Sequence, residues 1–132
     1  MTRDEIDKAS GRELDALVAV EVFGLLIKKV KTTTDRGPSF DWYVVGARLP
    51  LWKRVDRYSA GWPGVGLVNG EMERQGWNVD YSNNDFEGGK HPHEWTFFKT
   101  DPIIGSASGP DNAANCAKAA LYALLAEREG KS

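Results

Sequence analysis

The sequence predicts an α+β fold, and three observations support this. Apolar residues recur at helical spacing in 10–25 and again in 110–128. Apolar and polar side chains alternate in 77–82, as they do in a half-buried strand, and 40–48 is rich in aromatic and β-branched residues. A chain of 132 residues is long enough to bury a core and has the length of one domain, so we expect a single domain over 1–132.

The first long helix is expected to follow a short helical segment over 1–9. Ser10 and Glu13 have the spacing of a capping box, in which the serine side chain caps the helix and the glutamate binds back to it. The helix should run to about Leu25, with Gly24 weakening its last turn. Its apolar stripe is formed by Leu14, Leu17, Val18, Val22 and Leu25. This stripe is typical of a face that packs on the core, and partner binding is the alternative.

The next segment, 27–34, is ambiguous, because its lysines and threonines suit either an exposed strand or a loop. A turn is expected at 35–38, where Asp-Arg-Gly-Pro breaks regular structure. A strand should follow over 40–48 and a loop over 50–57.

A central helix is predicted over 61–75. Ser59 is a candidate N-cap, and Pro63 fits only the first turn, where the donor that it lacks costs little. Three glycines inside the helix, Gly64, Gly66 and Gly70, each cost about 1 kcal/mol relative to alanine. Tertiary packing must therefore hold this helix, which should end at Gly76 in a left-handed C′ position.

The C-terminal half should contain strands over 77–82, 93–100 and 103–107, and a helix over 110–128. The segment between the first two strands, 83–92, is rich in Asn, Asp and Gly and is expected to be an exposed loop. Gly105 leaves room for another element to pack closely on its strand. The last helix has a small-residue stripe formed by Ala113, Ala117, Ala120, Leu121 and Leu124.

Composition excludes several classes of protein. The net charge of −2, from 17 basic and 19 acidic residues, argues against a general DNA-binding protein. The single cysteine, Cys116, cannot form an intramolecular disulfide, and we expect a buried, unreactive thiol in a reducing compartment. The N-terminal residues lack the apolar core of a signal peptide, and no apolar run approaches the roughly 20 residues that span a bilayer. These features predict a cytoplasmic protein without membrane contact.

Motifs for catalysis, metal binding or cofactor binding are absent. His91, His93 and Glu94 could ligate zinc, but four ligands at a recognised spacing do not occur. Nucleophile–histidine pairs have almost no residues to form them, and the usual phosphate-loop and metalloprotease motifs are missing. The glycines of the central helix do not make a dinucleotide-binding fingerprint, because Asn69 stands where glycine is required. We therefore expect no catalytic residues, no metal and no cofactor.

The strongest functional signal is a cluster of cations and aromatic residues before the central helix. Arg54 and Arg57 precede a glycine-rich helix start, whose uncovered N–H groups favour an anion. Indole and phenol rings among cations suit stacking on a base next to a phosphate. The predicted ligand-binding residues are Trp52, Arg54, Arg57, Tyr58, Ser59, Gly61 and Trp62, and Trp42 and Tyr43 are further candidates for the same ligand wall. In the alternative interpretation, Trp52 closes the edge of the core and the cations lie in solvent.

The order of elements resembles that of the phage ABA-sandwich domain family. The matching motifs are RELDALVA at 12–19, Tyr58-Ser59, Gly76-Trp77 with Val79, Trp95 with Phe97, and the alanine-rich last helix. The resemblance covers most of the chain. It implies an antiparallel sheet between helical layers, in a protein encoded by a phage or prophage.

The resemblance implies no established activity, but small phage proteins include sponges that sequester nucleotide immune signals. Our hypothesis is such an anti-defence protein, which binds a small anionic nucleotide in the host cytoplasm without cleaving it and forms a homo-oligomer. The alternative is a protein–protein interaction module that inhibits a host protein or serves in phage assembly.

Overall fold

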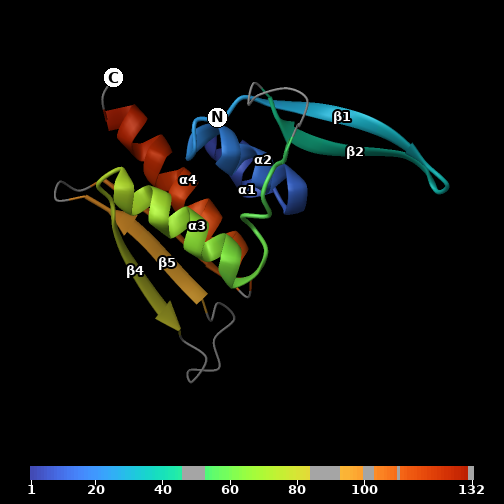
Figure 1. The fold of residues 1–132 in the computed structure, drawn as a ribbon. Coiled ribbons are helices and arrows are strands. Elements are labelled where there is room, and N and C mark those ends of the chain that lie inside the picture. Colours follow the sequence, from blue (N-terminus) through green and yellow to red (C-terminus); the bar gives the residue numbers. More distant parts are fainter. Residues whose placement is uncertain (46–52, 84–92, 100–102, 110, 131–132) are drawn as a thin grey trace.

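Runs of antiparallel strands are separated by helices along the chain (Figure 1). The structure is a computed structural model that describes residues 1–45, 53–83, 93–99, 103–109 and 111–130. Its elements are α1 (Arg3–Lys8), α2 (Gly11–Glu21), β1 (Ile27–Thr34), β2 (Gly37–Val44), β3 (Lys53–Arg54), α3 (Gly61–Arg74), β4 (Asn78–Asn83), β5 (His93–Phe98), β6 (Ile104–Gly109) and α4 (Asn112–Gly130). The predicted α+β class and the antiparallel pairing are confirmed.

The strands form two sheets, with orders β1-β2-β3 and β4-β5-β6. In the second sheet the register places Tyr81 opposite Trp95 and Val79 opposite Phe97, so these side chains share one face. That face packs on α3 and α4, and Trp95 and Phe97 are buried there. The alternate positions lie on the outer face and are mostly polar; Thr96 hydrogen-bonds Ser106 there, and Phe98 pairs with Ile104 at one end. One-sided burial explains the alternation seen in the sequence.

Helix α4 is the centre of the molecule, because it contacts α1, α2 and α3 as well as β5 and β6. Alanine side chains allow these close approaches. Gly105 of β6 is the tightest point, since a Cβ there would lie 2.0 Å from the backbone nitrogen of Ala123. The prediction that an element packs closely on Gly105 is confirmed. The largest fully buried side chains around α4 are Ile6, Leu14, Val18, Val68, Met72, Phe97 and Leu121.

The β1–β2 hairpin extends away from the helices (Figure 1). Its strands pair from Ile27 opposite Val44 to Thr34 opposite Gly37, so the ambiguous segment is a strand. The chain reverses at Asp35-Arg36, one residue before Gly37, which adopts a left-handed φ of 106°. The base of the hairpin packs on α2, and β3 adds two residues beside Tyr43 and Val44. The expectation of a loop throughout 50–57 is therefore wrong at Lys53–Arg54.

Two expectations for the first long helix are corrected. Ser10 is the N-cap residue of α2, as predicted, but its side chain makes no capping hydrogen bond. The helix ends at Glu21 instead of near Leu25. The cause is Gly24, which adopts a left-handed φ of 66° and lets the Leu25 N–H donate to the Ala19 carbonyl at 2.9 Å.

Helix α3 begins at Gly61 as predicted and ends at Arg74, one residue earlier than predicted, and it has a different N-cap. Its N-cap is Ala60 instead of Ser59, and this cap makes no side-chain hydrogen bond. The predicted left-handed conformation of Gly76 is confirmed: Gly76 has a φ of 93°, and the Trp77 N–H donates to the Met72 carbonyl at 3.0 Å. Burial of Val65, Val68 and Met72 supplies the packing that the glycine-rich sequence requires.

Other predicted features fall partly outside the described residues. These are the end of the 40–48 strand, most of the 83–92 loop, the Asp101-Pro102 turn and the first residue of the 110–128 helix.

Candidate functional site

The predicted ligand-binding residues do not form one cradle. Arg54 and Arg57 line a pocket of about 270 Å³ at the base of the hairpin. Gly61 and Trp62 line a different pocket, of about 430 Å³, between α3 and α4. Tyr58 lies between them in sequence but is buried in the core. Trp52 lies outside the described residues.

Tyr58 is a core residue and offers no surface to a ligand. It is only 3% exposed, and its ring stacks on Phe23 with centroids 4.7 Å apart and an interplanar angle of 20°. Burial raises the pKa of the Tyr58 phenol to about 12, and the nearby carboxylates of Asp56 and Asp15 add to the shift. Its place in the predicted ligand wall is therefore corrected.

Ser59 is held by a buried carboxylate from another part of the chain. Its backbone N–H donates to Asp15 Oδ1 at 2.7 Å, and its hydroxyl donates to the Gly11 carbonyl at 3.2 Å. Asp15 is 1% exposed and also accepts from Arg12 Nη1 at 3.0 Å. These bonds fix the segment that leads into α3, so Ser59 is a positioning residue rather than a helix cap.

Arg12 connects this buried carboxylate to the hairpin. Its Nε donates to Asp41 Oδ1 at 2.9 Å, and the Trp42 N–H donates to the same oxygen at 2.8 Å. Burial raises the pKa of Asp41, but the hydrogen bonds from Trp42 and Arg12 outweigh burial and hold it below the ordinary value of 3.8. The ionised carboxylate thus ties β2 to α2.

The pocket at the hairpin base contains both signs of charge. Its cations are Arg12, Lys53, Arg54 and Arg57, and its carboxylates are Asp41 and Asp56. Lys53 lies 3.4 Å from Asp56, and Arg54 lies 3.6 Å from Asp41. Carboxylates of the lining therefore pair with three of these four cations, Arg12, Lys53 and Arg54.

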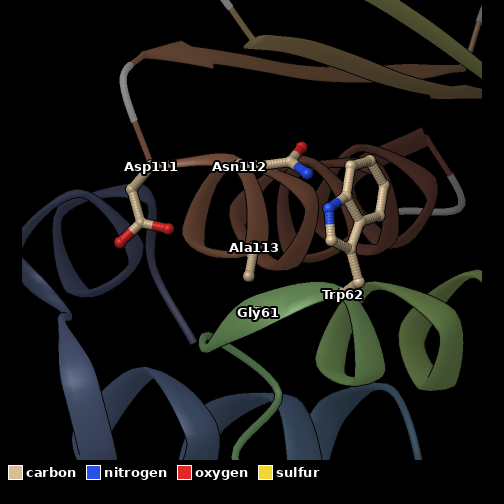
Figure 2. A pocket seen from close by; sticks show the side chains of 5 residues that line it. All are labelled: Gly61, Trp62, Asp111, Asn112 and Ala113. Carbon is tan, nitrogen blue, oxygen red and sulfur yellow. The ribbon is translucent and has the colours of Figure 1, made fainter.

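The larger pocket lies where the first turns of α3 and α4 meet (Figure 2). Gly61 and Trp62 come from α3, and Asn112 and Ala113 come from α4. The Trp62 indole is 63% exposed and stands beside the Asn112 amide, whereas the Asp111 carboxylate points away from that pair (Figure 2). An exposed ring next to hydrogen-bonding groups suits a flat, polar ligand.

The polar groups of this pocket are fixed by neighbours. Asn112 Oδ1 accepts from Trp95 Nε1 at 2.6 Å, which holds the amide in place. Asp111 Oδ1 accepts from the Ala114 N–H at 3.1 Å and so caps α4. Helix α3 has no such cap and no acidic residue in its first turn. The partial positive charge at the start of α3 is therefore available to an anion.

Aromatic side chains continue from Trp62 onto the second sheet. The Trp62 and Tyr81 rings form a T-shaped pair with centroids 6.4 Å apart, and the centroids of Tyr81 and Trp95 are 4.5 Å apart. The Tyr81 hydroxyl and His93 Nδ1 are 2.6 Å apart and share a hydrogen bond. Sequence reasoning missed Asp111 and Asn112. The signal available was Pro-Asp-Asn at the start of a helix, a pattern that favours a cap.

The cysteine and the possible metal ligands that the sequence offered do not form a reactive site among the described residues. Cys116 is buried as predicted; burial raises its pKa to about 12, and its thiol lies 3.5 Å from Asn69 Oδ1. Within the part of the chain that the structure describes, no three His, Cys, Asp or Glu side chains converge as a metal site. His91 lies outside this part. Among the same residues, no helix is long and apolar enough to cross a membrane.

The fold and the pocket define an α+β domain with a surface pocket between two helix starts. Comparison of the chain with models of known families, with curated proteins and with solved structures found no match.

Proposed function

We propose that this protein binds a small nucleotide-derived ligand in the pocket between α3 and α4, and releases it unchanged. The observation that carries the proposal is the exposed indole of Trp62 at the edge of a 430 Å³ cavity. A cavity of this size lies in the range of small-molecule sites, and stacking of a base on an indole contributes about 1–3 kcal/mol.

Each part of a nucleotide has a chemical counterpart in this pocket. The base stacks on Trp62, and the Asn112 amide hydrogen-bonds its edge. A phosphate lies at the uncapped start of α3, where the N–H groups of Gly61 and Trp62 are donors and the left-handed Gly61 keeps the approach open. The Asp111 carboxylate accepts hydrogen bonds from ribose hydroxyl groups.

The wider role that we propose is that of a phage anti-defence protein in the host cytoplasm. By this proposal it sequesters a nucleotide immune signal, of the cyclic ADP-ribose type or a cyclic oligonucleotide. The sequence resemblance and the exposed aromatic pocket support this role. Sequestration of this kind needs no catalytic group.

Isothermal titration against a panel of these nucleotides tests the proposal. We expect one member to bind and Trp62→Ala to weaken its binding about 10- to 100-fold, because the stacking platform is lost. Trp62→Phe should retain part of the affinity. Leu67→Ala is the matched control, since Leu67 is also exposed on α3 but does not line the pocket.

Mass spectrometry of the ligand recovered from the denatured complex then separates a sponge from an enzyme. Intact ligand is expected, and a cleaved product would refute sequestration. Absence of heat with every member of the panel would refute nucleotide binding.

A second candidate function is docking of a host protein on the outer surface of α3. Leu67 is 44% exposed there, next to Gly66, whose Cβ position is open. An exposed apolar patch favours a protein partner. In this case Leu67→Ala would abolish co-purification of the partner, whereas it should leave nucleotide binding unchanged.

A further inference from the structure

The β1–β2 hairpin has one face that is buried at its base and exposed further out. The pairing register places Ile27 opposite Val44, and four residues further along, on the same face, Lys31 lies opposite Phe40. Ile27 and Val44 pack against the core. Phe40, on the same face, is 54% exposed. This side of the hairpin therefore presents an aromatic ring to solvent.

A groove lies under the base of the hairpin, on the same side of the molecule. This groove, the α2 groove, has a volume of about 590 Å³. Its apolar lining is Ala9, Ala16, Leu17, Val20, Ile27 and Trp42, and its charged residues are Glu5, Lys8 and Glu13. Since Trp42 shares its face with Phe40, the groove and the exposed ring are continuous. A groove of this kind accepts an aromatic anchor.

The charges of the two surfaces are complementary. The hairpin face carries Lys29 and Lys31, and the Lys29 ammonium lies 5.1 Å from the centre of the Phe40 ring. Two of the three charged residues of the α2 groove are glutamates, Glu5 and Glu13. A partner that presents an aromatic ring flanked by lysines therefore fits the groove, and this hairpin is such a surface.

We infer that the α2 groove binds the hairpin of a second copy of this chain. In a two-fold dimer, Phe40 of each copy enters the groove of the other, and Lys31 of each copy approaches Glu13 of the other. A two-fold interface uses the same surface twice, which requires that hairpin face and groove lie on one side, as they do here.

Two properties of the hairpin support a contact through its face. A two-stranded hairpin is marginally stable in water by itself, so its outer half gains stability when it is covered. Pairing along the open edge of β1 is disfavoured, because lysines protect that edge from another strand. The inference concerns a surface separate from the nucleotide pocket and does not depend on the proposed function.

Sedimentation equilibrium of the full chain tests the dimer. We expect a monomer–dimer equilibrium that Phe40→Asp weakens about 100-fold, since each dimer loses two copies of the anchor. Lys31→Glu and Glu13→Lys should each weaken it about 10-fold or more. The control is Lys28→Glu, which makes the same charge change on the opposite face of β1. Circular dichroism of each variant confirms that it is folded.

Mixing the two charge variants gives the decisive measurement. In a mixed dimer of Lys31→Glu and Glu13→Lys, one interface pairs the two original side chains and the other pairs the two substituted ones. The mixture should therefore dimerise as tightly as the wild type, although each variant alone does not. Recovery of dimerisation in the mixture is not expected if the chain associates through a different surface or binds a different protein.

Two results would overturn the inference. One is a wild-type chain that stays monomeric at high micromolar concentration. The other is a dimer whose dissociation constant is unchanged by Phe40→Asp, which would place the interface elsewhere.

Discussion

Substituting alanine for glycine should have opposite effects on stability at different positions of α3. At Gly66 and Gly70 an added Cβ would have no neighbour within 4 Å. Alanine should stabilise the protein there by about 1 kcal/mol, because it favours the helix and meets no obstacle. At Gly64 the same Cβ would lie 2.5 Å from the Tyr58 carbonyl oxygen and 2.7 Å from that of Arg57.

The cost at Gly64 follows from these distances. Ordinary van der Waals contact begins at 3.4 Å, so the Tyr58 carbonyl oxygen must move by about 0.9 Å. That carbonyl immediately precedes the Ser59 N–H, which binds the buried Asp15 at 2.7 Å. Overpacking of this kind costs about 1–3 kcal/mol. The gain in helix propensity offsets part of this cost, and we expect Gly64→Ala to lower the free energy of unfolding by about 1–2 kcal/mol.

Urea denaturation followed by tryptophan fluorescence measures all three variants. The expected order of stability is Gly66→Ala and Gly70→Ala above the wild type, and Gly64→Ala below it. If Gly64→Ala were as stable as Gly66→Ala, the close contact between the start of α3 and the preceding segment would be refuted. If Gly66→Ala were destabilising, the outer face of α3 would not be open.

Further predictions concern the packing of α4 and the titration of buried groups. Gly105→Ala should cost about 3 kcal/mol or more, because its Cβ would meet only helix backbone; a stability within error of the wild type would contradict the β6–α4 contact. Asp15→Ala should cost about 2–3 kcal/mol in urea denaturation, because the Ser59 N–H loses its acceptor and Arg12 loses one of its two carboxylate partners. The lowered pKa of Asp41 means that its stabilising contribution is present above pH 3.8 and is lost as the pH falls through the lower folded value, and Asp41→Asn should remove this part of the acid dependence. The raised pKa of Tyr58 acts at the alkaline end instead. Stability should fall as the pH rises from 10 towards about 12, and it should fall less in Tyr58→Phe.

The sequence predicted those features of the fold that depend on local patterns. The end of α3 at Gly76 was predictable because only glycine readily adopts the left-handed position that closes the helix. The strand at Ile27–Thr34 was left open because its run of lysines and threonines has no alternating apolar face. This segment is a strand because it pairs with 37–44, and the residues of 27–34 alone do not reveal that pairing.

The candidate site was less predictable, because it depends on contacts between distant segments. Tyr58 and Trp62 are close in sequence, yet only Tyr58 is buried. Its ring stacks on Phe23, which follows α2, whereas Trp62 is exposed. Ser59 was a reasonable cap by its chemistry, but Asp15 binds its N–H from 44 positions away. Asn112 joins the pocket only because α3 and α4 start side by side.

The central position of α4 has a consequence for synthesis of the chain. It is the last of the described elements to leave the ribosome, and it supplies the surface on which the earlier helices and β5 and β6 assemble. Until α4 emerges, Leu14, Val18 and Phe97 have no shared interior to enter. These elements should therefore fold together once α4 has emerged, as one cooperative event.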